Sequence, residues 1–540
     1  MLVDLIVEDA RIRTMDSATE VTDRMAVHHG RVLALGEDVE GLRAKETLRL
    51  EGATVTPGFN DAHCHPVMLG VALGELDLSE RSCRTLDDVY AVVKRRSREV
   101  PEGGWIVGAG YDQNKLGGHP QRHLLDQVAP RHGVWLKHAS GHMCAVNSVL
   151  LAEIGVLSGT AKIPSGGVVQ TDWAGNPTGL LEEQAQRLVR DLVVPLSEES
   201  IAEALERACA LAASQGVTSW TDAGIGGGWI GHSSREVGAY LTARATGRLT
   251  VRTTLMVAAD CLHEVRRHVD DRGDIGLDLA IRTGLGDDRL RIGAMKLFAD
   301  GSLVGRTAAM QDQYQGEPGN TGYLQDDAQS LRDGIVQAHL AGWQVAAHAI
   351  GDRAVDVVLD AVEEAQRTLP RPNARHRMEH AGVVSDAQLR RVLEWRIMPV
   401  PQGEFLSAIG DGMSAAVGPD RKRLLYRQRS FVRAGVVVPG SSDRPVVPGA
   451  PLTGLRDLVL RQTSGGEVLG EDERLTAHEA LHAWTVGSAY AEHAERDKGS
   501  LTPGKLADFV VLADDPVEVA PNLIADIEVV GTYLGGERSG

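Results

Sequence analysis

The sequence predicts an α/β protein: a (β/α)8 TIM barrel, with a composite β-sandwich domain from both termini and an inserted subdomain after barrel strand 1. Three observations support this prediction. Strand-like and helical stretches alternate through the middle of the chain, and both ends are rich in short strands. One long segment, 67–200, differs from the rest of the middle in its pattern of short strands and turns. The expected domains are 1–55 plus 487–540 for the β-sandwich, 56–486 for the barrel and 67–200 for the insertion.

The two ends of the chain consist of short apolar runs separated by turn signals such as His29-Gly30. A unit of three or four strands would bury little core alone, which favours pairing of the two ends into one domain. Two independent β appendages are the alternative. The expected strands are 2–7, 24–27, 31–35, 508–512 and 527–533.

The middle of the chain contains eight candidate strands alternating with helical stretches, as in a parallel barrel. The count reaches eight only if about 67–200 is an insertion between strands one and two. From that loop the insertion would cover the C-terminal face, where a barrel's active site lies. The candidates are the strand ending at His65, then 216–222, 251–257, 290–298, 343–348, 376–380, 396–400 and 436–440, with insertion strands at 103–112 and 133–138 and a hairpin at 166–177.

Composition limits the classes of function. The chain of 540 residues has a net charge of −18, which argues against a nucleic-acid or anionic-membrane binder because both need a basic surface. No hydrophobic run is long enough for a membrane span, and the acidic N-terminus does not resemble a secretion signal. The 5 cysteines form no Cys-x-x-Cys pair, which fits reduced thiols. We therefore expect a cytoplasmic protein.

A metal half-site is predicted where the first strand ends. The run 53–56 is closed by Pro57-Gly58 and followed by a segment that contains His63, Cys64 and His65. Alternate side chains of a strand point to the same side, so His63 and His65 project together and Cys64 points away. Two imidazoles placed in this way suit Zn²⁺, although two incidental histidines are the alternative.

Further polar residues fall at the ends of later strands. His348 ends strand five, His380 ends strand six and Asp443 follows strand eight. Neutral imidazoles and carboxylates can hold a metal with room left for water, whose pKa the metal lowers towards ~7. Asp443 beside such a site could act as general base and pass the proton to the leaving group. Each histidine judged alone could instead be a core or surface residue.

Lys296, within strand four, is the unusual member of this set. A protonated lysine is repelled by a cation, but a desolvated neutral lysine can react with CO₂ to form a carbamate that could bridge two metals. The alternative is a buried lysine paired with Asp300 or Asp222. The residues leave both possibilities open.

These residues resemble the amidohydrolase superfamily, and most closely its YtcJ-like branch, which includes the N-substituted formamide deformylases. The resemblance covers essentially the whole chain and implies a metal-bearing barrel with a β-sandwich from both termini. It also implies that His63, His65, Lys296, His348, His380 and Asp443 are metal ligands, with Lys296 carboxylated in binuclear members and Asp443 also the general base. The motifs are GFNDAHCHP, MKLFADGSL, HAIGDRAVD, RHRMEHA, GSSDRPV and GSLTPGKLADFVVL.

Four other residues are candidates for the site. The segment 139–148 resembles a block of the same branch, so His142 could donate a hydrogen bond to the substrate carbonyl, a structural role being the alternative. Asp300 could hydrogen-bond a metal-binding histidine. Trp105 and Tyr111 of the insertion could contact the substrate, with buried packing as the alternative.

The sequence therefore predicts a metal-dependent hydrolase acting on a non-peptide C–N bond of a small molecule, such as an N-formyl or N-acyl amide. A deaminase of a cyclic substrate is the enzyme alternative, although deaminases of the superfamily usually place a glutamate where this chain has Gly351. A catalytically inactive binding protein is the third reading. Zn²⁺ is the expected metal, as one or two ions, while iron, manganese or nickel could use the same ligands. A homodimer or other homo-oligomer is expected only from the frequency of symmetric assemblies.

Overall fold

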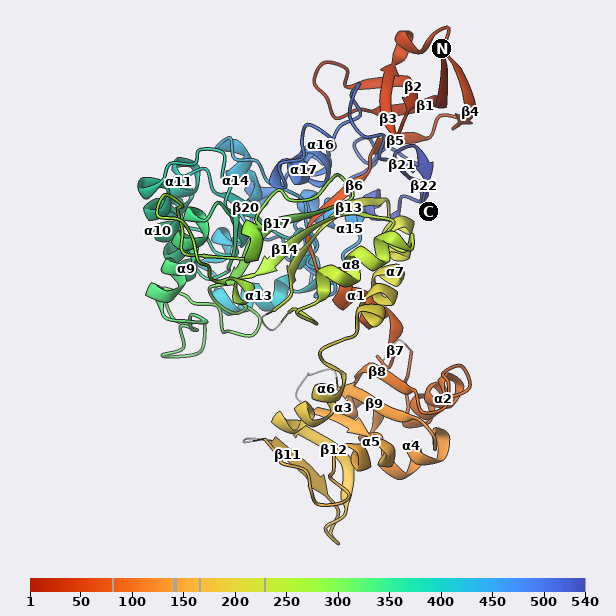
Figure 1. Cartoon of the computed structure of the whole chain (residues 1–540), viewed down its shortest axis with the longest axis vertical. Helices are drawn as coiled ribbons and strands as arrows, with labels where there is room; N and C mark the ends of the chain where they lie inside the picture. The colour runs from red at the N-terminus through yellow and green to blue at the C-terminus, as the bar shows by residue number, and fades with distance from the viewer. Residues whose placement is uncertain (80–81, 139–142, 165–166, 228–229, 540) are drawn as a thin grey trace. The chain divides into compact units, whose positions relative to one another are not determined.

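The computed structural model describes residues 1–79, 82–138, 143–164, 167–227 and 230–539. The chain divides into two compact units (Figure 1). The first consists of Met1–Pro66 and Ala208–Gly540, and the second of Val67–Arg207. Helix α7 (Glu198–Ser214) carries the chain from the second unit back into the first.

A mixed sheet in the first unit combines strands from both ends of the chain, which lie side by side in Figure 1. Strand β5 joins the two ends, since it pairs parallel with β1 and antiparallel with β21. Val55 and Phe509 are fully buried in the core of this sheet. The predicted pairing of the two termini is therefore confirmed. The strands are β1 (Leu2–Arg13), β2 (Val21–His28), β3 (Arg31–Leu35), β4 (Arg43–Arg49), β5 (Thr54–Pro57), β21 (Phe509–Leu512), β22 (Val529–Leu534) and β23 (Glu537–Arg538).

The same unit contains a nearly closed parallel sheet, in the order β20-β19-β18-β17-β14-β13-β6 among the described residues. Every residue of β13 and β14 is buried, because helices cover the outer face and side chains fill the inner one. The bounds of the strands in this sheet are β6 (Phe59–Cys64), β13 (Val217–Ile225), β14 (Arg252–Ala258), β17 (Leu290–Phe298), β18 (Val345–Ala349), β19 (Arg377–His380) and β20 (Met398–Val400).

Gly58 separates two strands that belong to different sheets. β5 ends at Pro57 in the mixed sheet, and β6 begins at Phe59 in the parallel sheet. A Cβ at Gly58 would lie 2.2 Å from Oγ1 of Thr218, so no side chain fits there. His63 thus lies near the end of a second strand and His65 just after it, while the run 53–56 belongs to the terminal sheet.

The predicted eighth strand, 436–440, is not a strand in this described part of the chain. Pro439 lacks the amide hydrogen that a regular ladder requires. The following segment nevertheless contacts both edges of the parallel sheet. Ala62 N donates to Gly440 O at 3.0 Å and Asp443 N to His63 O at 2.7 Å, while Ser441 Oγ donates to Pro401 O at 3.1 Å. These contacts nearly close the sheet.

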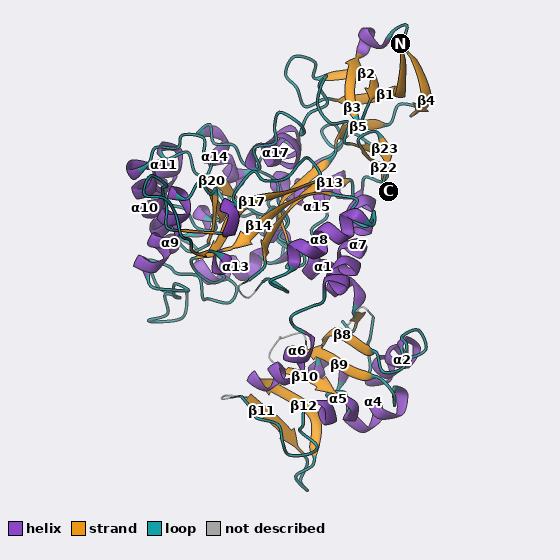
Figure 2. Ribbon diagram, viewed as in Figure 1, coloured by secondary structure: helices purple, strands orange, loops and turns teal. Residues whose placement is uncertain are grey.

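Helices surround the parallel sheet (Figure 2). Helix α10 shows why, since its buried residues recur at helical spacing from Ala354 to Ala365. Within the described residues, no helix has both the length and the apolar character needed to cross a membrane. The helices that follow α7 are α8 (Glu236–Ala245), α9 (Ala328–Leu340), α10 (Asp352–Thr368), α11 (Asp386–Glu394), α12 (Phe405–Ala408), α13 (Gly410–Val417), α14 (Gln428–Arg433), α15 (Pro451–Leu460), α16 (Ala477–His482) and α17 (Ser488–Ala491).

The second unit has its own sheet, in the order β11-β12-β10-β9-β8-β7, and its own core around Ile106, Val134 and Leu136. The predicted hairpin is present as β11 and β12, whose turn is held by Asp172 Oδ1 accepting from Ala174 N at 2.8 Å. The elements are α1 (Pro66–Gly74), β7 (Leu76–Asp77), α2 (Leu86–Arg96), β8 (Trp105–Tyr111), α3 (Gln113–Leu116), α4 (Arg122–Val128), β9 (Gly133–His138), β10 (Met143–Val146), α5 (Ser148–Glu153), β11 (Gly167–Thr171), β12 (Pro177–Glu183) and α6 (Arg187–Val193).

Candidate metal centre

His63, His65 and Asp443 form a buried group at the carboxyl end of β6. One potential ligand atom from each lies within 4.8 Å of the other two. His65 Nε2 is 3.0 Å and His63 Nε2 is 3.4 Å from Asp443 Oδ1. The thiol of Cys64 points away and donates to Thr221 O at 3.6 Å, as strand alternation requires. Asp443 adopts a φ of +58°, so a left-handed turn directs its carboxylate toward the two imidazoles.

A buried carboxylate orients His63. Glu379 Oε2 accepts a hydrogen bond from His63 Nδ1, which directs Nε2 toward Asp443 Oδ1. Arg377 holds Glu379 through Nε at 2.7 Å and Nη2 at 3.0 Å. Burial raises the pKa of Glu379, yet Arg377 and His63 together hold that pKa well below its usual range. Burial and Lys296 lower the pKa of His63, but the carboxylates of Glu379 and Asp443 outweigh them and raise it.

His380 lies beside these residues, and its ring orientation is fixed by Gln402. The ring centroids of His63 and His380 are 5.1 Å apart. Gln402 Nε2 donates to Val400 O at 2.9 Å, so its Oε1 must be the atom that accepts from His380 Nδ1 at 2.7 Å. Nε2 of His380 therefore carries the free lone pair. Burial lowers the pKa of His380 to about 3, which keeps the imidazole neutral.

His348 extends the cluster from the end of β18. Its ring centroid lies 4.5 Å from that of His380. Because the carbonyl of Gly301 can only accept, His348 Nε2 carries the proton in the 2.9 Å hydrogen bond between them, and Nδ1 is left as the lone-pair nitrogen. Burial, with His380, lowers the pKa of His348 well below its ordinary value. His348 and His380 thus each have one engaged nitrogen and one free nitrogen, whereas His63 has Nδ1 on Glu379 and Nε2 facing Asp443.

Lys296 is buried in β17, and its Nζ has no hydrogen-bond partner among the described residues. Neither carboxylate considered as its partner serves that purpose: Asp222 accepts from the hydroxyl of Tyr240, and Asp300 accepts from backbone amides. The ammonium group would instead lie 4.7 Å from the ring centroid of Phe298. Burial lowers the pKa of Lys296 to about 8, against the attraction of nearby Glu379 and Asp443. The ion-pair alternative for Lys296 is therefore not what the structure shows.

Asp300 supports the loops around His348. Its carboxylate accepts from Ala309 N at 2.9 Å, Ile350 N at 3.0 Å and Gly351 N at 2.8 Å. Oδ1 lies 3.5 Å from His348 Nε2, which is adjacent but longer than a good hydrogen bond. Burial raises the pKa of Asp300 to about 7. The main contact of this side chain is with the backbone that precedes α10.

This donor set fits a divalent metal such as zinc, since imidazoles, a carboxylate and a buried amine without a hydrogen bond in the described residues converge at strand ends. A model of the amidohydrolase family matches residues 46–539. The chain belongs to the amidohydrolase family. Its recognition from the sequence motifs is confirmed.

Relatives of this amidohydrolase match over nearly their full length. The Bacillus subtilis (strain 168) protein YtcJ is 32% identical over 541 residues, covering 97% of this chain and 97% of that protein. The N-substituted formamide deformylase of Arthrobacter pascens is 30% identical over 558 residues, covering 99% of each. The crystal structure of an uncharacterized metal-dependent hydrolase from Pyrococcus horikoshii OT3 aligns with a TM-score of 0.77 and 26% identity, covering 96% of this chain and 99% of that one.

Three candidate substrate contacts of the amidohydrolase belong to the second unit. His142 lies outside the described residues. Tyr111 is fully buried in the core of its unit, with its hydroxyl 3.3 Å from His119 Nδ1. Trp105 is partly buried against a neighbouring apolar cluster. A role for these residues in substrate binding stays a prediction.

The sequence reasoning missed Glu379, Arg377 and Gln402, which orient the candidate ligands. A signal for the first two was present, because Arg377 and Glu379 stand at i and i+2 of a predicted barrel strand and must point to one face. Two charges on a buried face require partners. Gln402 gave no comparable signal, since it lies in a loop 22 residues after His380.

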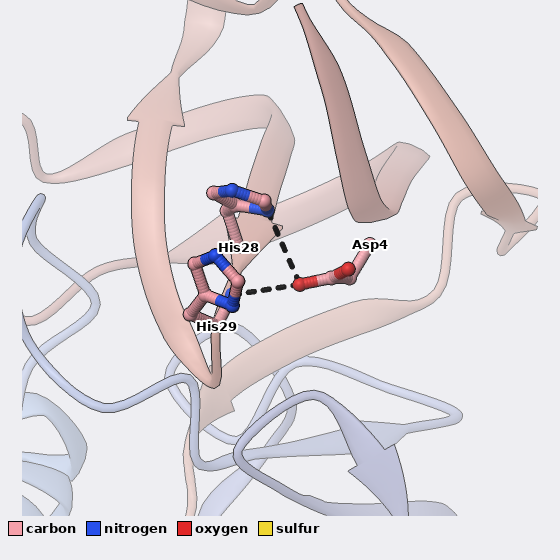
Figure 3. A group of neighbouring side chains, drawn as sticks. All are labelled: Asp4, His28 and His29. Carbon is pink, nitrogen blue, oxygen red and sulfur yellow. Dashed lines mark hydrogen bonds and ion pairs between the residues drawn. The ribbon is translucent and has the colours of Figure 1, made fainter.

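A second group of the same residue types, Asp4, His28 and His29, lies in the mixed terminal sheet (Figure 3). His28 Nδ1 is 3.2 Å from Asp4 Oδ2, and the backbone N of His29 donates to the same oxygen at 2.7 Å. Lys45 Nζ lies 2.7 Å from Asp4 Oδ1. His29 is exposed, and the lysine already neutralises the carboxylate.

Proposed function

We propose that this chain is a metal-dependent hydrolase that cleaves a non-peptide carbon–nitrogen bond of a small molecule, such as an N-formyl or N-acyl amide. The observation that carries the proposal is the buried convergence of His63, His65 and Asp443, with His348 and His380 beside them, each with one free ring nitrogen. The relative named N-substituted formamide deformylase, at 30% identity over 99% of the chain, favours an amide substrate.

The fold supports this proposal as well. We infer that the nearly closed sheet is a (β/α)8 barrel in which the segment 440–443 takes the place of the eighth strand, because its backbone bonds to β6 and its Ser441 contacts Pro401 after β20. Asp443 then stands at a strand end like the histidines. In barrels of this kind, groups at the carboxyl ends of the strands perform the chemistry.

The metal would be held by His63, His65, His348, His380 and Asp443, and Zn²⁺ suits these nitrogen and oxygen donors. Lys296, as a neutral amine, could add to CO₂ with loss of a proton and provide a carbamate for a second ion. When bound, a divalent metal supplies a water of lowered pKa and polarises the substrate carbonyl. About two ions per chain in wild type, falling in Lys296→Ala and not restored by bicarbonate, would support the carbamate.

Asp443 is the proposed general base. Burial raises its pKa, but His63 and His65 hold the pKa well below its ordinary value, so the carboxylate is ionised at neutral pH. It can accept the proton of the attacking water and deliver it to the departing amine nitrogen. His142 is proposed to donate a hydrogen bond to the substrate carbonyl oxygen. Glu379, Gln402 and Gly301 keep the imidazoles in fixed tautomers throughout.

The test is a substrate screen on zinc-supplemented protein, comparing N-alkyl and N-aryl formamides, N-acetyl amines and aminated heterocycles. We expect release of carboxylate and amine in equal amounts from one of the first two classes, and loss of that activity in Asp443→Asn. Ammonia release from the heterocycles alone would replace the proposal with deamination. Activity that persists in Asp443→Asn would remove this carboxylate from the mechanism.

A further inference from the structure

A cavity of about 400 Å³ lies in the first unit at the amino-terminal end of the parallel sheet. Thr254 is the third residue of β14, Arg291 the second of β17 and Arg377 the first of β19, and all three line it. The candidate metal ligands stand at the opposite ends of the strands. The cavity is therefore separate from the candidate metal centre.

Positive charge dominates the cavity wall. Arg291, Arg371 and Arg377 line it, together with His493 and one carboxylate, Glu492. Glu492 is already satisfied, because it accepts from Asn60 Nδ2 at 2.6 Å and from Lys498 Nζ at 3.1 Å. Arg377 is likewise paired with Glu379. Burial raises the pKa of Glu492, but Lys498 and Arg291 lower it, so Arg291 shares this carboxylate with Lys498. Within the described residues neither Arg291 nor Arg371 forms an ion pair, and the wall carries more positive than negative charge.

Arg291 is the least engaged of these groups. Its guanidinium has no hydrogen bond or ion pair within the described part of the chain, although the side chain is half-buried. Its charge reaches the neighbouring groups: the pKa of His493 falls to about 4 through burial, Arg375 and, to a smaller extent, Arg291. A half-buried guanidinium with no partner usually has a ligand or ordered water as its acceptor.

Two further features extend this donor set. Arg371 donates through Nη1 to His339 O and Trp343 O and through Nη2 to Gly342 O, so its position is fixed while it keeps its charge. Thr221 is fully buried, lines the same cavity, and its Oγ1 has no hydrogen-bond partner among the described residues. A rigid cation, a cation without an ion pair among the described residues and a hydroxyl without a hydrogen bond thus line one cavity.

We propose that this cavity binds a small oxyanion, a phosphate or a carboxylate, through Arg291 and Arg371 with Thr221 as a hydroxyl donor. Guanidinium groups match the paired oxygens of both anions. A cation is disfavoured by the excess of positive charge on the wall, and a neutral ligand would leave Arg291 and Arg371 without an anionic partner. The cavity volume allows an anion larger than inorganic phosphate, so a phosphate or carboxylate on a small organic molecule also fits.

Calorimetric titration of the zinc-loaded, full-length protein with inorganic phosphate and, separately, with malonate tests this proposal. We expect saturable binding of at least one anion, and the tighter one identifies the source of the oxyanion. Arg291→Gln should weaken that binding about tenfold or more, the loss of one charge-assisted contact. The control Arg390→Gln makes the same charge change on the exposed surface of α11 and should bind like wild type.

Thr221→Val provides a second variant that keeps the shape of a buried side chain. It should retain the fold and weaken the anion severalfold, since only the unpartnered hydroxyl is removed. An anion affinity that is unchanged in Arg291→Gln would mean that the anion binds elsewhere, for example at the metal centre, and that result overturns the proposal. Absence of saturable binding by either anion overturns it as well.

Discussion

Two groups of one aspartate and two histidines in this amidohydrolase have the spacing of a metal site, but their surroundings differ. His63, His65 and Asp443 are buried, whereas Asp4 and His28 are partly exposed and His29 is exposed. Glu379 orients His63 in the first group. In the second, Lys45 lies 2.7 Å from the aspartate that a metal would need. Suitable residue types at short distances are therefore insufficient. Burial, an oriented imidazole and a carboxylate that forms no ion pair with a lysine or arginine among the described residues distinguish the buried group.

The largest difference between the groups should appear in catalysis. Asp443→Asn removes the proposed general base and one ligand, and we expect turnover to fall by at least about 10²-fold. Asp4→Asn is the matched change in the surface group and should leave turnover unchanged. Steady-state kinetics with the substrate found in the screen, and circular dichroism to verify folding, provide the measurement. Equal losses in the two variants would contradict the distinction.

Orientation of His63 by Glu379 is the next expected contribution. Glu379→Gln should lower zinc affinity by about 10–100-fold, because the imidazole loses its charged partner. It also leaves Arg377 buried without its carboxylate, so we expect unfolding to become easier by about 3 kcal/mol or more. Competition with a chromogenic chelator measures the affinity. Lys45→Met, beside Asp4, is the control, and a change of affinity there as large as that in Glu379→Gln would show that the surface group holds the ion.

Lys296 should give the metal-free protein a pH-dependent stability. Its pKa of about 8 in the folded chain lies below the ordinary 10.5, so the unfolded chain binds more protons between these values and stability rises as pH rises from 8 to 10.5. Lys296→Met removes this dependence and should be more stable than wild type at pH 7 by up to about 3 kcal/mol, an advantage that shrinks toward pH 10.5. Urea unfolding with a chelator present checks this. A constant difference across that range would mean that Lys296 has an ordinary pKa.

The smallest effect is expected in the surface group. His29 has a φ of +50°, which asparagine also tolerates. His29→Asn should therefore change the free energy of unfolding by no more than about 0.5 kcal/mol. Thermal unfolding with and without added zinc is the measurement. A zinc-dependent rise in melting temperature that disappears in this variant would indicate a genuine surface site.

Local sequence patterns predicted the parts of this molecule that depend on local structure. The alternation around Cys64 placed His63 and His65 on one side, and the alternation of strand-like and helical stretches located the strands that end near His348 and His380. The prediction of a regular strand at 436–440 was wrong, because Pro439 prevents a continuous ladder of hydrogen bonds. Backbone hydrogen bonds to β6 nevertheless hold the segment that begins at Gly440. The contact between His63 and Glu379 spans 316 residues, and no local periodicity reports such a pairing.

Metal content per chain tests the distinction between the two groups most directly. Elemental analysis of zinc-grown protein would compare wild type, the double variant His63→Ala/His65→Ala and the double variant His28→Ala/His29→Ala. We expect wild type and the surface variant to retain the same tightly bound metal, and the buried variant to lose it. Retention of metal in the buried variant, or its loss in the surface variant, would contradict the assignment of the metal centre.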